Sequence, residues 1–216
     1  MREQIIQKVL DKKIVAIVRG VYGEDCVNLA RALCEGGIEL LEVTFDQSKP
    51  ESLNRTSDTI RQLVEQLGDR MIFGAGTVTT LEMLELARNA GAQFVVSPDT
   101  NEEVIKATVA AGMVSMPGAL TPTEIVTAHR YGADFVKLFP AGTQGTAYFK
   151  AVTAPLNHIR LLAVGGVNEK NIADFMAAGA VGAGVGGNLV NKTWIANGEF
   201  DKITALAKEF TEKAGV

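Results

Sequence analysis

Short apolar runs recur along the chain, and segments with apolar residues at helical spacing separate them. The runs are continuously apolar rather than alternating, which is typical of strands buried on both faces of a parallel sheet. The first residues, "MREQIIQKVLDKK", have helical spacing and predict an N-terminal helix. We expect eight strands, at Lys13–Gly20, Glu39–Phe45, Met71–Val78, Phe94–Asp99, Val114–Leu120, Phe135–Gly142, Ile159–Val167 and Ala180–Gly187.

Polar residues and glycines mark the ends of the helices between these strands. Side chains that can cap a helix N-terminus precede four helical segments. They are Thr79-Thr80, Thr100-Asn101, Thr121-Pro122 and Asn168. Several helices end at a glycine, which suits a left-handed C-terminal cap. These glycines are Gly36, Gly91, Gly112, Gly132 and Gly179.

The repeated strand–helix unit predicts the fold class. Variants of a glycine followed by a short apolar strand recur, as in "NAGAQFVV", "AAGMVSM" and "AAGAVGAGV". Eight such units predict an α/β fold, a single (β/α)₈ TIM barrel over residues 1–216 with an N-terminal helix. An open doubly wound sheet is the alternative, although no break marks a reversal of strand order.

Composition narrows the function classes. Hydrophobic residues make up 47% of the 216 residues and the net charge is −4, as in ordinary soluble globular proteins. No basic stripe points to nucleic acid. The N-terminus lacks the apolar core of a signal peptide, and the stretch from Met176 to Gly187 is too short to cross a bilayer. Cys26 and Cys34 are expected to be reduced thiols. We therefore expect a cytoplasmic protein with no membrane or nucleic-acid partner.

Two ionisable residues interrupt strands that should be buried, Glu42 in "LLEVTF" and Lys137 in "FVKLF". They could form a buried ion pair with each other, or Glu42 could pair with Arg19, without any catalytic role. Alternatively, burial lowers the pKa of the lysine and supplies a neutral amine that attacks a carbonyl. A nearby carboxylate would then serve as the base.

Further candidates lie at the C-terminal ends of the predicted strands, where the active sites of such barrels lie. They are Arg19, Thr77, Ser97-Pro98 and Pro117-Gly118. The glycines of "AVGGV" (163–167) and "GVGGN" (184–188) end the last two strands and can bring backbone N–H groups close to an anion. Tight turns or close packing would also explain them. The letters "GAGVGG" match a dinucleotide motif, but too little chain follows for that fold. His129 and His158 lie away from the strand ends, so a zinc site is not expected.

In these residues the chain resembles the class I aldolases that cleave 2-keto-3-deoxy-6-phosphogluconate (KDPG) and 4-hydroxy-2-oxoglutarate (KHG). The resemblance spans nearly the whole chain through "AIVRG", "GGIELLEVTF", "GAGTV", "FVVSPDTNEEV", "MPGALTPTEI", "DFVKLFPAG" and "AVGGVNEKNI". It implies a barrel that releases pyruvate and an aldehyde, glyceraldehyde 3-phosphate or glyoxylate, from a 2-keto acid. It also implies a homotrimer that needs neither a metal nor an organic cofactor.

The resemblance further implies roles for single residues. Lys137 would form the Schiff base and Glu42 would transfer protons. Arg19 and Thr77 would hold the pyruvyl carboxylate, beside a wall made by Pro98 and Phe139. The glycines expected to face the distal phosphate are Gly165, Gly166, Gly186 and Gly187.

Three positions depart from the family pattern. Asp46 stands where many members carry an arginine, and Val164 and Gly187 stand where members often carry hydroxyl side chains. The identity of the aldehyde half is therefore left open. A barrel isomerase or epimerase, with Glu42 as base and Lys137 as an electrostatic group, is a second candidate. A sugar-phosphate-binding regulator without catalytic activity is a third.

Overall fold

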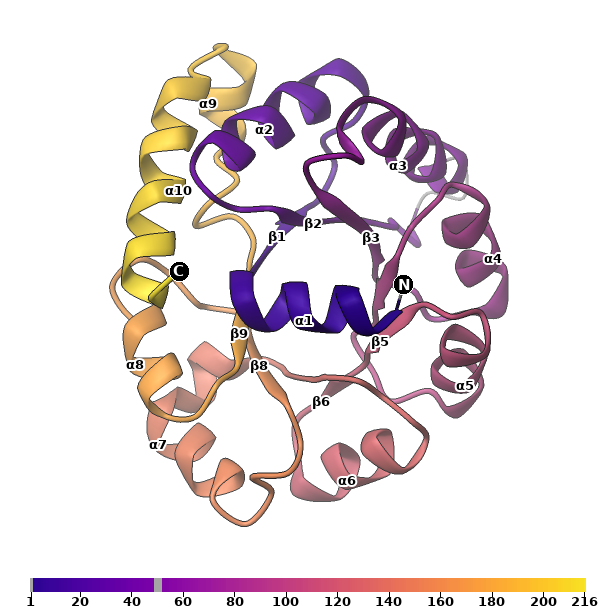
Figure 1. The fold of residues 1–216 in the computed structure, drawn as a ribbon, viewed down its shortest axis with the longest axis vertical. Helices are drawn as coiled ribbons and strands as arrows, with labels where there is room; N and C mark the ends of the chain where they lie inside the picture. Colours follow the sequence, from indigo (N-terminus) through magenta and orange to yellow (C-terminus); the bar gives the residue numbers. More distant parts are fainter. Residues whose placement is uncertain (1, 49–51) are drawn as a thin grey trace.

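A computed structural model describes residues 2–48 and 52–216 of the chain, as a sheet surrounded by helices (Figure 1). The strands are β1 (Ile14–Val18), β2 (Leu40–Thr44), β3 (Ile72–Gly76), β4 (Phe94–Val96), β5 (Val114–Met116), β6 (Gly118–Ala119), β7 (Val136–Leu138), β8 (Leu161–Val164) and β9 (Gly182–Val185). The helices are α1 (Arg2–Lys12), α2 (Gly23–Glu35), α3 (Ser52–Leu67), α4 (Leu81–Asn89), α5 (Glu102–Ala110), α6 (Pro122–Arg130), α7 (Ala141–Thr153), α8 (Ile172–Ala177), α9 (Lys192–Ala196) and α10 (Phe200–Ala214).

The strands form a nearly closed parallel barrel in the order β5-β4-β3-β2-β1-β9-β8-β7-β6. Only Pro117 separates β5 from β6, so the chain itself completes the ring between the two ends of the sheet. Proline has no backbone N–H to donate to a ladder, which explains why the fifth predicted run is divided there. The predicted barrel is confirmed, and the open doubly wound sheet is wrong.

Each predicted run contains a strand, but several strands end earlier than expected. The fourth strand ends at Val96 and the seventh at Leu138, so Pro98 and Phe139 lie in the loops that follow. These loop residues are as apolar as the strands before them. The loops that follow these two strands therefore begin three and four residues earlier than the apolar pattern indicates.

Three of the predicted helix starts are confirmed. The hydroxyls of Thr80 and Thr121 and the amide oxygen of Asn101 each accept a hydrogen bond from the first turn of α4, α6 and α5, respectively. The start at Asn168 is wrong, because α8 begins at Ile172. The Asn168 side chain instead accepts from the N–H of Lys170 at 2.9 Å, so it closes a turn before the helix.

Four of the predicted glycine caps are left-handed, with φ between 73° and 103° at Gly91, Gly112, Gly132 and Gly179. Gly36 is the exception. Its φ is −84°, and Gly37 is the left-handed residue, at 90°. A Cβ on Gly36 would lie 2.3 Å from the Cβ of Ala207 on α10, so this glycine permits close helix packing rather than a left-handed cap.

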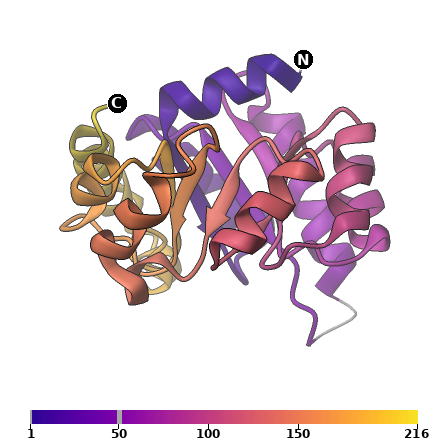
Figure 2. The same cartoon turned by 90° about the horizontal axis from the view of Figure 1, so that it is seen from below.

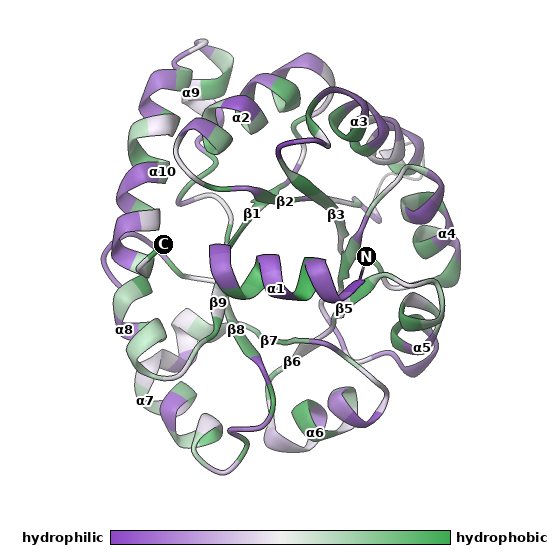
Figure 3. Cartoon of the chain, in the orientation of Figure 1, coloured by the Kyte–Doolittle hydropathy of each residue, from purple (hydrophilic) through white to green (hydrophobic). Residues whose placement is uncertain are grey.

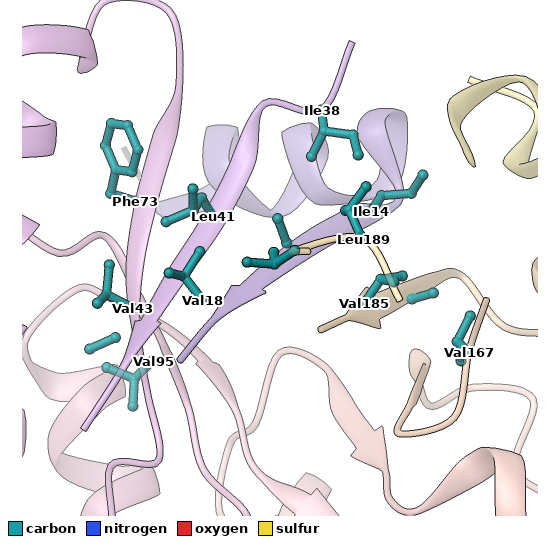
Figure 4. Close-up of a cluster of buried hydrophobic side chains, with 14 of the residues drawn as sticks. Ile14, Val18, Ile38, Leu41, Val43, Phe73, Val95, Val167, Val185 and Leu189 are labelled. Carbon is teal, nitrogen blue, oxygen red and sulfur yellow. The ribbon is translucent and has the colours of Figure 1, made fainter. Parts of the chain in front are cut away.

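Two apolar clusters make the core. The larger lies between the strands and the surrounding helices, and Figure 4 shows part of it, with Leu41, Val43 and Phe73 on the sheet side. The helices are apolar toward the sheet and polar toward solvent (Figure 3). The smaller cluster fills the inside of the barrel and includes Leu40, Phe94, Phe135 and Leu162.

Helix α1 closes the N-terminal end of the barrel. It crosses the barrel opening in Figure 1 and covers one end of it in Figure 2, with Ile5, Ile6 and Val9 in the inner cluster. Ion pairs fasten both ends of the helix. Arg2 pairs with Asp134 at 2.7 Å, and Lys8 and Lys12 pair with Glu39. In the described part of the chain, no helix is long and apolar enough to cross a membrane.

Candidate active site

A cavity of about 430 Å³ opens at the C-terminal ends of the strands, at the end of the barrel opposite α1. The ten residues to which the resemblance gives a role line it, although they come from loops and strands far apart in the chain. These residues are Arg19, Glu42, Thr77, Pro98, Lys137, Phe139, Gly165, Gly166, Gly186 and Gly187. The other strand-end candidates, Ser97, Pro117 and Gly118, are not among the described residues that line the cavity.

Alternation along the strands explains why these side chains meet. Glu42 points inward because it is two residues from Leu40, which belongs to the inner cluster, and the same spacing relates Lys137 to Phe135. Glu42 also pairs in register with Ile17, two residues before Arg19. The ionisable groups thus lie on an apolar floor, with Arg19 nearer the mouth.

Lys137 is a buried amine, with only 8% of its surface exposed. Burial lowers the pKa of Lys137 below its ordinary value of 10.5, and Arg19 lowers it further. Glu42 and, less strongly, Asp99 act in the opposite direction. The ammonium nitrogen lies 4.9 Å from the centre of the Phe139 ring, whose face favours a cation. Burial outweighs these contacts, so at a given pH a larger fraction of Lys137 is neutral than of a surface lysine.

Glu42 is also buried, at 2% exposure. Burial raises the pKa of Glu42 to about 7, even though Lys137 and Arg19 both lower it. The carboxyl group lies directly over Gly76. A Cβ at Gly76 would lie 2.5 Å from Oε1 of Glu42. With a pKa near neutrality, this carboxyl group can both accept and donate a proton.

The alternative, in which Glu42 forms a direct ion pair with Lys137 or Arg19, does not fit this geometry. Among the described residues, neither Lys137 nor Arg19 has a nitrogen within 4.0 Å of a Glu42 oxygen. Glu42 and Lys137 nevertheless share a small space. Both line a nearly filled cavity of about 10 Å³ with apolar side chains such as Val96 and Met116. The two groups face each other across this space without direct contact.

The rim of the cavity combines a strained backbone with exposed side chains. Thr77 follows β3 with φ of 59°, in the left-handed region that a β-branched residue rarely adopts. Such strain marks positions that the surrounding structure holds for a purpose. Ser97 donates a 2.6 Å hydrogen bond to the Val78 carbonyl and so links the loops that carry Thr77 and Pro98. Phe139 is 40% exposed. These rim residues are accessible to a ligand.

The glycines after β8 allow close packing and also line the cavity. Gly165 and Gly166 have φ of 85° and 79°. A Cβ at Gly165 would lie 2.9 Å from the Phe139 ring, and one at Gly166 would lie 3.0 Å from the Cα of Gly142. The packing explanation for these two glycines is therefore correct, but both also line the cavity. Gly187 has open space around its Cα and a φ outside the left-handed region, so packing does not require it.

Sequence reasoning missed several residues of the site. Ile17, Val167 and Asn188 also line the cavity, beside Val164 and Gly184, which the sequence already indicates. Thr44, two residues after Glu42 on the same inward face, is 2% exposed. Its Oγ1 is the single buried side-chain polar atom without a hydrogen-bond partner in the described part of the chain. Only the period-two alternation from Glu42 could have pointed to Thr44.

The two histidines lie elsewhere. The rings of His129 and His158 contact each other edge to face, with centroids 5.5 Å apart, and neither lines the cavity. Within residues 2–48 and 52–216, no three His, Cys, Asp or Glu side chains are grouped as a metal site. Among the described residues, the polar groups that line the cavity are an amine, a carboxyl, a guanidinium, a hydroxyl, a side-chain amide and peptide groups.

Comparison with known proteins is consistent with this site. The KDPG and KHG aldolase family model matches residues 5–206. A 2-dehydro-3-deoxy-phosphogluconate aldolase of Treponema pallidum (strain Nichols) is 36% identical over 208 residues, 94% of each chain. A 2-dehydro-3-deoxy-6-phosphogalactonate aldolase of Escherichia coli (strain K12) is 32% identical over 92% of this chain and 95% of that protein.

A solved structure matches over a similar length. The KDPG aldolase from Legionella pneumophila, with pyruvate captured at low pH as a covalent carbinolamine intermediate, superposes with a TM-score of 0.82. The two sequences are 26% identical, and the match covers 94% of this chain and 96% of the Legionella pneumophila chain. With its barrel, its buried lysine and these relatives, the chain belongs to the KDPG and KHG aldolase family.

Proposed function

We propose that this protein is a class I aldolase that cleaves a 2-keto-3-deoxy sugar acid, or 4-hydroxy-2-oxoglutarate, to pyruvate and an aldehyde. The observation that carries the proposal is a buried lysine with a lowered pKa, facing a buried carboxyl group in an open cavity. The relatives named for the phosphogluconate and phosphogalactonate acids support this substrate class.

Lys137 is proposed as the nucleophile. Its neutral amine adds to the C2 carbonyl and forms a carbinolamine, which loses water to give an iminium. The relative that holds pyruvate as a covalent carbinolamine supports this step. When the C3–C4 bond breaks, its electron pair moves into the iminium and leaves an enamine on Lys137. Protonation at C3 and addition of water then release pyruvate and restore the amine.

Glu42 is proposed as the group that moves protons in these steps. It donates a proton to the departing hydroxyl of the carbinolamine and accepts the C4 hydroxyl proton when the C3–C4 bond breaks. Its pKa of about 7 supports both roles, because a group that titrates near the working pH transfers protons in either direction.

The remaining cavity residues are proposed to bind the substrate. Arg19 and Thr77 hold the carboxylate of the pyruvyl half, and Pro98 and Phe139 form an apolar wall beside it. The distal end of the substrate, including a terminal phosphate, would face the peptide groups of Gly165, Gly166, Gly186 and Gly187. In residues 2–48 and 52–216, no arginine or lysine side chain lines the cavity beside these glycines, so the N–H groups would supply the binding.

Borohydride trapping tests the proposal. Pyruvate and borohydride together should inactivate the enzyme and leave one reduced adduct, which peptide mass spectrometry should locate on Lys137. Lys137→Met should give no adduct. A wild-type enzyme that forms no adduct, or forms it on another lysine, would refute the mechanism. Pyruvate release from phosphorylated and unphosphorylated 2-keto-3-deoxy acids would then identify the aldehyde half.

The assembly is proposed on the family resemblance alone, and the location on the composition and the two cysteines expected to be reduced. We propose a homotrimer in the cytoplasm, and sedimentation analysis of the full chain tests the trimer.

A further inference from the structure

The loop after β8 has an unusual arrangement of hydrogen bonds. The carbonyl groups of residues 165–167 in this loop accept hydrogen bonds from donors outside this three-residue stretch. Gly165 O accepts from the N–H of Gly142 at 2.7 Å. Gly166 O accepts from the side-chain amide of Asn171 at 3.0 Å, and Val167 O from that of Asn188 at 2.9 Å.

These bonds orient the peptide groups of the loop. In a planar trans peptide the N–H points away from the C=O of the same unit. Because Gly165 O and Gly166 O are held by their donors, the N–H groups of Gly166 and Val167 point the opposite way. Neither N–H donates to an acceptor in the described part of the chain, and both residues line the cavity. The loop is therefore a ready cradle for an anion.

The two asparagines reach this loop from different elements. Asn188 follows β9, so its amide joins the second glycine-rich loop to the first, and the residue itself lines the cavity. Asn171 precedes α8, and its Oδ1 accepts from the N–H of Asn168 at 2.8 Å. This second bond fixes the direction of its amide. Asn188 contacts the loop through one N–H···O bond, whereas Asn171 donates to Gly166 O and accepts from the N–H of Asn168, so its substitution removes two hydrogen bonds.

We propose that Asn171 and Asn188 are positioning residues for the anionic end of the substrate, and that this end is a phosphate. They hold the loop carbonyls away from the ligand, so that the peptide N–H groups face it. Glycines with positive φ tolerate many backbone conformations, and without the amides a peptide unit could turn its carbonyl toward the phosphate. The inference rests on the proposed aldolase function and adds a role for two side chains that do not carry out chemistry.

Steady-state kinetics with two substrates test this inference. Asn188→Ala should raise KM for 2-keto-3-deoxy-6-phosphogluconate about 10-fold, the effect of one hydrogen bond. Asn171→Ala removes two hydrogen bonds and should raise this KM by at least about 10-fold. Both variants should leave kcat within about 2-fold. Neither should change KM for 4-hydroxy-2-oxoglutarate, which has no phosphate. Asn188→Asp, which replaces the donor with a negative charge, should raise KM for the phosphorylated acid further. Asn197→Ala, at an exposed asparagine outside the cavity, is the matched control.

The outcomes separate this inference from the aldolase proposal. Pyruvate trapping on Lys137 should be unchanged in every asparagine variant, because pyruvate does not reach the loop. If the wild type forms no adduct, the aldolase proposal fails. If trapping is normal, two results with the asparagine variants would refute the positioning role: equal changes in KM for both substrates, or no change in KM for the phosphorylated acid. A wild type that does not cleave the phosphorylated acid would refute it as well.

Discussion

Glu42 and Lys137 face one cavity from β2 and β7, strands with β1, β9 and β8 between them, and burial favours the neutral form of both. Each charge attracts the other, yet desolvation is the larger influence on both groups. In an ion pair at the surface, attraction between the charges would instead lower the pKa of the carboxyl group and raise that of the amine. The site therefore holds an amine that loses its proton easily and a carboxyl group that retains its proton.

The neighbours of Lys137 predict how its titration responds to substitution. Glu42 raises the pKa of Lys137, so Glu42→Gln should lower that pKa further below 10.5. Arg19 lowers it, so Arg19→Gln should raise it toward 10.5. The pH dependence of Lys137 acetylation by acetic anhydride, followed by mass spectrometry, measures both shifts. Two shifts in the same direction would contradict the assigned electrostatics.

The raised pKa of Glu42 predicts a pH-dependent stability. Because the folded pKa of about 7 exceeds the ordinary 4.5, the folded state binds the proton more tightly. The resulting stabilisation is complete below pH 4.5 and is lost as the pH rises through 7. Glu42→Gln lacks this dependence. The free energy of unfolding of wild type relative to Glu42→Gln should fall by roughly 2–3 kcal/mol between pH 5 and pH 8. Urea unfolding of both proteins at the two pH values measures it, and parallel curves would contradict the raised pKa.

Gly76 is predicted to be required for the position of Glu42. A Cβ there would also lie 2.9 Å from Cγ2 of Thr44, so Gly76→Ala must displace side chains in a packed interior. We expect a loss of about 1–3 kcal/mol of stability and at least about a 10-fold loss of kcat. In a Glu42→Ala background the stability cost should be smaller, because the clashing carboxyl group is absent. An equal cost in both backgrounds would exclude Glu42 as the obstacle.

The Thr44 hydroxyl predicts an unusual result for a core substitution. Because Oγ1 is buried without a protein partner, Thr44→Val removes a desolvated polar group and keeps the shape. The free energy of unfolding should stay the same or rise by up to about 1 kcal/mol. Thr108→Val is the matched control, since that buried hydroxyl donates to Val104 O at 2.7 Å and its loss should cost about 1 kcal/mol. A larger loss for Thr44→Val would indicate a hidden partner, such as a bound water.

The barrel could be predicted from the sequence because strands buried on both faces need continuous apolar runs, and all eight runs contain strand residues. Strand ends were predicted less well. The fourth predicted run extends to Asp99, yet β4 ends at Val96, just before Ser97 and Pro98. The division at Pro117 depends on a hydrogen bond that proline cannot make, and the start of α8 depends on which asparagine closes the preceding turn.

The candidate site could be predicted where residue chemistry conflicts with its surroundings. Glu42 and Lys137 stand out because charged residues rarely occur in buried strands, and the ten predicted residues line one cavity, although their roles stay predictions. Asn171 and Asn188 could not be found this way. Asparagine is common in loops. The carbonyl that Asn171 binds depends on how its own loop folds back, and the one that Asn188 binds depends on how two loops pack together.

Helix α1 also has a kinetic consequence. Because it closes the far end of the barrel, the cavity is a blind well, and substrate and both products must pass through the same mouth. In the proposed mechanism, the pyruvyl half is bound to Lys137 at the bottom and cannot leave past the aldehyde half above it. Cleavage should therefore release products in a fixed sequence, with the aldehyde first and pyruvate last, and pyruvate should inhibit competitively with the intact substrate.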